Sequence, residues 1–161
     1  MPSGAPYHAP MASLLDHPEN AGALGYLAHG RPAADAGFGP PPPDIDRLHL
    51  GTHPDIVDWL WDALNAALPV DCRWLVFDGP ALVDPASGLI LAAGIGTQYA
   101  LRLLPEDVAT AVEHGSELVH RFHTVGTALD LAATFGSDWV FGRHHEQEPD
   151  WLRARYEARR G

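Results

Sequence analysis

The longest apolar block of the sequence, interrupted only by turn residues, spans residues 73–104, and this pattern predicts the central sheet. Short apolar runs separated by turn residues predict strands over residues 73–77, 81–83, 89–93 and 97–104. The segment from Asp84 to Gly88 predicts a hairpin, because proline presets one turn dihedral and glycine supplies a positive φ. The links are too short for parallel crossovers, so an antiparallel meander is expected.

The last of these strands distinguishes the two faces of the sheet. Its alternation assigns Tyr99, Leu101 and Leu103 to an apolar face and Gln98, Ala100 and Arg102 to a more polar one. Helices are expected to cover the apolar face. The predicted fold is therefore α+β, with a mostly antiparallel sheet of four to six strands and helices packed on one face.

Residues 53–68 predict the first long helix. Apolar residues recur there at spacings of three and four and form one stripe: Ile56, Trp59, Leu60, Ala63, Leu64 and Ala67. Asp55, Asp58 and Asp62 lie away from this stripe and are expected to face solvent. Trp61 falls off the centre of the stripe, which predicts a part-exposed aromatic residue able to contact a partner.

Shorter elements follow. Patterning predicts a helix over residues 106–114, a strand over 117–124, a helix over 127–135, an edge strand over 138–141, a polar loop over 142–147 and a helix over 149–159. A strand over 117–124 would place His120 and His123 on opposite faces, because successive side chains alternate.

Residues 1–48 differ in composition from the rest of the chain. Nine of the fifteen prolines lie there, and glycine and alanine fill much of the remainder. Such a segment buries little apolar surface to offset the entropy of ordering it. We therefore predict a tail over residues 1–48 that is disordered or loosely docked, and a single α+β domain over residues 49–161.

Charge and composition narrow the functional classes. The net charge is −11, which disfavours nucleic acid and anionic membranes and favours a basic partner. All ten positive charges are arginines, with no lysine, and together with abundant alanine, glycine and proline this is typical of high-GC bacterial coding. A single cysteine, Cys72, suits a reducing cytoplasm. Neither a signal peptide nor an apolar run of membrane-spanning length is expected.

No recognisable catalytic or cofactor signature stands out. Asp78 and Asp84 end short strands and are interpreted as turn residues, and the Gly94–Thr97 segment lacks both the lysine and the spacing of a phosphate-binding loop. The sequence therefore leans away from an enzyme, with no predicted catalytic residue and no predicted cofactor.

The leading hypothesis is a protein-binding module. Its predicted contact residues combine acidic side chains with aromatic anchors: Asp55, Asp58, Trp61, Asp62 and Trp139. In size, acidity and lack of catalytic motifs, the chain is similar in bulk character to bacterial immunity-type inhibitors, which neutralise a toxin by masking its surface. Together with the negative charge of the chain, this hypothesis predicts a basic protein partner.

The alternative hypothesis rests on histidines near the C-terminus. A small histidine-dependent enzyme or ligand-binding protein could use a divalent metal such as zinc, held by residues from the set His120, His123, His144, His145 and Glu146. No strong metal-binding spacing such as HExxH supports it.

Overall fold

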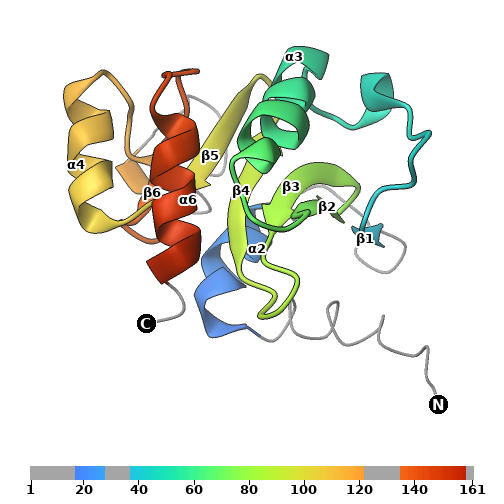
Figure 1. Ribbon diagram of the computed structural model, residues 1–161, viewed down its shortest axis with the longest axis horizontal. Helices are drawn as coiled ribbons and strands as arrows, with labels where there is room; N and C mark the ends of the chain where they lie inside the picture. Colours follow the sequence, from blue (N-terminus) through green and yellow to red (C-terminus); the bar gives the residue numbers. More distant parts are fainter. Residues whose placement is uncertain (1–16, 28–36, 122–134, 159–161) are drawn as a thin grey trace.

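The computed structural model describes residues 17–27, 37–121 and 135–158 of the chain. Its centre is one sheet of six strands in sequence order (Figure 1). The strands are β1 (Phe38–Gly39), β2 (Arg73–Val76), β3 (Gly79–Val83), β4 (Ile90–Ile95), β5 (Gln98–Arg102) and β6 (Trp139–Phe141). Every neighbouring pair is antiparallel, which confirms the predicted α+β class and the antiparallel meander.

The predicted hairpin connects β3 to β4. The Asp84 carboxylate accepts hydrogen bonds from the Ala86 N–H at 3.0 Å and from the Ser87 hydroxyl at 2.8 Å. Gly88 has a φ of 81°, in the left-handed region that glycine tolerates. Asp84 is therefore a turn residue, as its sequence context predicted.

The longer helices cover one face of the sheet, as predicted. They are α3 (Pro54–Asp58) and its continuation η5 (Trp59–Leu64), α4 (Pro105–Glu113) and α6 (Glu148–Ala158). The core beneath them includes Ile56, Leu60, Leu64, Leu82, Leu101, Leu152 and Tyr156. None of the helices in the described ranges is long and apolar enough to cross a membrane.

The opposite face is also covered, which corrects the expectation of a more polar surface there. The short elements η2 (Pro18–Asn20) and α2 (Ala21–Leu27) lie against it. The second core cluster includes Ala23, Trp74, Val83, Ile90, Ala100 and Trp139. The Asn20 side chain, fully buried, donates to the Gly88 carbonyl at 2.7 Å and accepts from the Ile90 N–H at 2.9 Å, so it continues the hydrogen bonding of the sheet.

The segment after α4 differs from its prediction. Residues 119–121 form a single 3-10 turn, η6 (Val119–Arg121), and only an isolated bridge joins Leu118 to Val140. The predicted strand over 117–124 is therefore wrong for its described part. This segment pairs with β6 only through the bridge at Leu118 and then turns into η6. His123 and nearly all of the predicted helix over 127–135 lie outside the described residues.

Candidate functional site

The helix that carries the predicted acidic face changes its winding at Trp59. From Trp59 to Leu64 it is a π-helix, in which hydrogen bonds join residues i and i+5 and each turn is wider than an α-turn. This winding directs Leu60, Trp61 and Leu64 together into the core. Trp59 lies only half-buried at the rim of the core.

The prediction that Trp61 is part-exposed is wrong for this reason. Its ring is only 2% exposed, and its indole N–H donates to the Ala81 carbonyl of β3 at 3.0 Å. Trp139, the second predicted aromatic contact, is 1% exposed and belongs to the core beneath α2. The aromatic side chain that reaches the surface beside the predicted aspartates is Trp59.

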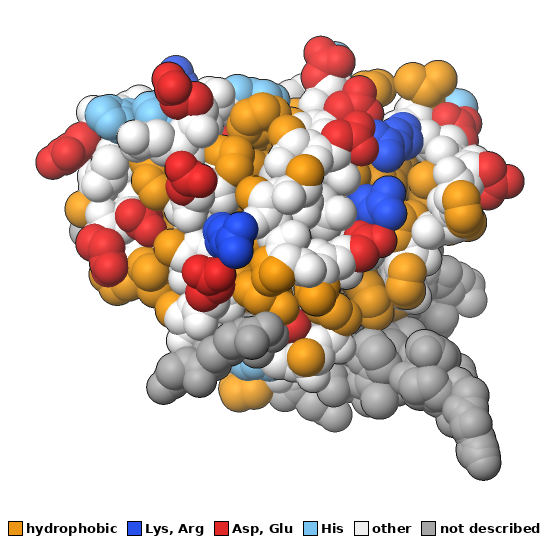
Figure 2. Space-filling model, in the orientation of Figure 1, with side chains coloured by type: hydrophobic (Ala, Val, Ile, Leu, Met, Phe, Trp, Pro, Cys, Tyr) orange, Lys and Arg blue, Asp and Glu red, His pale blue; other side chains and the backbone are white. Residues whose placement is uncertain are grey.

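A shallow groove of about 430 Å³ follows this helix. Its lining consists of Asp55, Asp58, Trp59, Asp62, Ala63 and His144. The structure thus brings the three predicted aspartates together with one histidine from the predicted metal set. Figure 2 shows acidic side chains gathered over α3, next to arginine side chains. We call this surface the acidic groove.

Arg47 forms ion pairs with two of the aspartates that line the acidic groove. It belongs to the 3-10 turn η4 (Arg47–His49), and its guanidinium binds Asp58 at 2.8 Å and Asp62 at 3.0 Å and 3.2 Å. The same guanidinium lies 5.5 Å from the Trp61 ring centroid. Its hydrogen bonds to the carboxylates of Asp62 and Asp58 raise the pKa of Arg47 above its ordinary value. Both aspartates remain more than half exposed.

Glu148, the first residue of α6, holds the Trp59 side chain that lines the acidic groove. Its carboxylate is 1% exposed and accepts from the Trp59 indole N–H at 2.9 Å, the Tyr99 hydroxyl at 2.5 Å and the Arg143 backbone N–H at 2.8 Å. Buried carboxylates require such partners, because desolvation without hydrogen bonds is strongly unfavourable. Glu148 therefore holds Trp59 and the loop over residues 142–147 in a fixed arrangement.

The Tyr99 hydroxyl extends this arrangement to His144. It accepts from the His144 backbone N–H at 2.6 Å, and the His144 ring lies 5.1 Å from the Tyr99 ring and 5.0 Å from the Trp59 ring. A side chain at Gly142 would overlap the Tyr99 ring, so the close approach of the loop requires glycine there. Burial, reinforced by the charge of Glu148, raises the pKa of Tyr99 above its ordinary value.

Because this pKa is raised, the protein is expected to lose stability at alkaline pH. Above pH ~10 the unfolded chain loses the tyrosine proton while the folded protein keeps it, so the free energy of unfolding falls as pH rises. We expect Tyr99→Phe to be less stable than wild type at pH 8, and this difference to narrow as pH approaches 11. Urea unfolding of both proteins across that range measures it, and a constant difference would contradict the assignment.

The predicted metal set is only partly brought together. His144 lines the acidic groove, whereas the His145 ring is stacked between His114 and Trp151, with centroid separations of 4.7 Å and 5.1 Å. His120 lies half-buried on η6. Within the ranges that the structure describes, no three histidine, cysteine, aspartate or glutamate side chains could hold a metal ion together. His123 lies outside those ranges, so the five-residue set stays a prediction.

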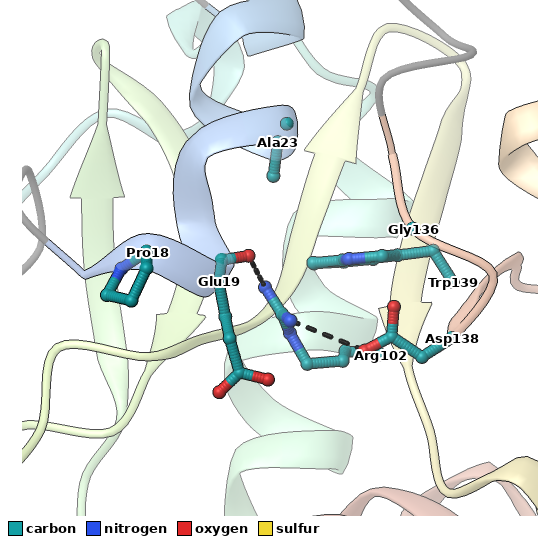
Figure 3. A pocket seen from close by; sticks show the side chains of 8 residues that line it. Pro18, Glu19, Ala23, Arg102, Gly136, Asp138 and Trp139 are labelled. Carbon is teal, nitrogen blue, oxygen red and sulfur yellow. Dashed lines mark hydrogen bonds and ion pairs between the residues drawn. The ribbon is translucent and has the colours of Figure 1, made fainter.

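A second cavity, of about 270 Å³, lies between α2 and the sheet. Figure 3 shows Arg102 beneath the Trp139 ring, held by the Glu19 carbonyl and the Asp138 carboxylate. Arg102 is 2% exposed and also donates to the Ile90 carbonyl at 2.7 Å, and burial lowers its pKa. Because acceptors of the protein already surround its guanidinium, we interpret this cavity as part of the packing of α2.

Sequence reasoning missed four residues of the acidic groove and its support: Arg47, Trp59, Tyr99 and Glu148. Trp59 and Tyr99 fit their apolar stripes, and Arg47 lies in a segment with a tail-like composition. Only Glu148 could have been singled out from the sequence, because an acidic residue next to the start of a predicted helix is stabilised by the positive end of the helix dipole.

Comparisons of the chain with protein-family models, with curated proteins and with solved structures find no match, so the groove is interpreted from its own geometry.

Proposed function

We propose that the protein is a non-enzymatic binding module whose contact surface is the acidic groove and whose partner is a basic protein. One observation carries the proposal: Trp59, held through its indole N–H by the buried Glu148, lies at the surface among three aspartates and His144. Aromatic residues with restricted motion are frequent binding hot spots, and carboxylates around them attract a cationic surface.

The charge of the groove supports a basic partner. Arg47 is the arginine paired with Asp58 and Asp62, and Asp55 adds a third carboxylate, so negative charge remains in excess. The net charge of the whole chain, −11, would also steer a basic protein toward this molecule over longer range. In its finer form, the proposal is a cytoplasmic bacterial inhibitor that masks the basic surface of its target.

Replacing two aspartates tests the role of charge. We expect the double variant Asp58→Asn and Asp62→Asn to associate with a basic partner about tenfold more slowly at low salt, because steering depends on groove charge. The partner is first captured on the immobilised wild-type chain and purified. Stopped-flow association rates are then measured at several salt concentrations, and the difference should shrink as salt rises.

The matched control removes the same charge elsewhere. Glu106→Gln with Glu113→Gln changes two exposed residues of α4, which lies apart from α3 (Figure 1). This control should lower the association rate much less than the groove variant. A partner whose association is insensitive to the groove variant and to salt would contradict the proposal.

A further inference from the structure

We infer that the group bound in the acidic groove is an arginine side chain of the partner, recognised by carboxylates together with the Trp59 ring face. This inference rests on the proposed function and specifies its ligand chemistry. It separates arginine from lysine, which carries the same charge in a different shape.

The protein already binds a guanidinium on this helix. Arg47 reaches Asp62 through two of its nitrogens, at 3.0 Å and 3.2 Å, while one of them also reaches Asp58 at 2.8 Å. A planar fork of donors fits carboxylates one helical turn apart, and a compact ammonium group makes fewer such contacts. Arg47 therefore shows which cation geometry these two carboxylates accept.

The aromatic side of the groove favours the same group. The Trp59 indole N–H is already donated to Glu148, and its half-buried ring lines the groove, so what Trp59 can offer a ligand there is the aromatic surface of the ring. The His144 ring lies beside it, with an interplanar angle of 42°. A weakly hydrated guanidinium stacks on such a face, whereas a strongly hydrated ammonium loses more by approaching it.

Asp55 supplies an acceptor that Arg47 does not use. Its nearest basic neighbour among the described residues is His53, with Nδ1 and Oδ2 3.9 Å apart. Asp58 stays more than half exposed while bound to Arg47, so it can accept a second guanidinium. An arginine that contacts the Trp59 ring would thus have Asp55 and the exposed part of Asp58 within the same groove.

Two peptides of equal charge test the inference. Hexa-arginine and hexa-lysine are titrated into the full chain at low salt by isothermal calorimetry. We expect the wild type to bind hexa-arginine about three- to fivefold more tightly than hexa-lysine, the size of an exposed cation–π preference. Trp59→Leu should reduce the preference to the part that the carboxylates supply, while Trp59→Phe, which keeps an aromatic ring, should retain more of it. Circular dichroism confirms that each variant is folded.

Arg47 provides a second, independent comparison. Arg47→Ala frees Asp58 and Asp62 and should tighten hexa-arginine binding more than Arg73→Ala does. Arg73→Ala is the matched control, because it removes the same charge from a nearby surface. Arg73 pairs with Asp71 and not with an aspartate of the groove.

The outcomes separate the inference from the proposed function. Equal affinity for the two peptides, or a preference that Trp59→Leu leaves unchanged, would overturn the arginine assignment without contradicting the proposal of a basic partner. Equal effects of Arg47→Ala and Arg73→Ala on hexa-arginine affinity would show that only the overall charge of the protein matters, which would also overturn the assignment. Failure of both peptides to bind the wild type at low salt would overturn the proposed basic partner as well.

Discussion

Glu148→Ala is expected to lower the free energy of unfolding by about 3–5 kcal/mol, because three donors lose their acceptor. The Trp59 indole N–H, the Tyr99 hydroxyl and the Arg143 backbone N–H all converge on this buried carboxylate. Each buried donor left without a partner costs about 1–3 kcal/mol. The same variant should weaken partner binding, because Trp59 and His144 lose their fixed positions. Urea denaturation and calorimetry measure the two effects.

Two comparisons make this result specific. Glu146→Ala removes an exposed glutamate from the same loop and should change stability by no more than about 0.5 kcal/mol. Glu148→Gln keeps one oxygen that can accept from Trp59 and Tyr99, so it should be less destabilising than Glu148→Ala. A loss below about 1 kcal/mol for Glu148→Ala would show that the carboxylate does not organise the groove.

Arg102→Ala is expected to lower the free energy of unfolding by a similar amount, about 3–5 kcal/mol. Its guanidinium joins β5 to three other segments, through the carbonyls of Ile90 and Glu19 and the carboxylate of Asp138. It also lies 4.7 Å from the Trp139 ring centroid. Removing it leaves these acceptors unpaired and opens a void beneath α2, so near-ultraviolet circular dichroism of the tryptophans should change along with stability.

The control for Arg102 is an arginine at the surface. Arg153→Ala breaks an exposed i to i+4 pair with Glu157 and should cost about 0.5 kcal/mol or less. In addition, Asp138→Ala introduced together with Arg102→Ala should cost less than the sum of the two single changes, since the charges are removed as a pair. Additive effects would contradict a direct coupling between these two residues.

The parts of the fold that were predictable from the sequence are set by local chemistry. The turn from Asp84 to Gly88 is specified by its own residues, and β2 to β5 follow from apolar runs punctuated by such turns. The start of α4 is likewise local, because Pro105 suits the first turn of a helix. The three aspartates of the groove were predictable as well, since spacing along one helix places them together.

The remaining features depend on contacts between distant residues. Asn20 pairs with Gly88 and Ile90, and nothing in the composition of residues 1–48 indicates this contact. Arg102 lies on the sheet face that was predicted to be more polar, because the sequence pattern does not specify that α2 covers that face. The π-helix reverses the expected exposures of Trp59 and Trp61. It could not be predicted from the apolar stripe, because that pattern is read at 3.6 residues per turn.

The meander order of the sheet has a consequence for the kinetics of folding. The pairs from β2 to β5 close short loops, whereas joining β6 to β5 closes the whole stretch between Arg102 and Trp139. Short loops close at a smaller entropic cost, so the β2–β5 hairpins are expected to form before β6 and α6 dock. Glu148 lies in the late-docking part. Stability lost there should therefore appear mainly as faster unfolding, with the folding rate nearly unchanged.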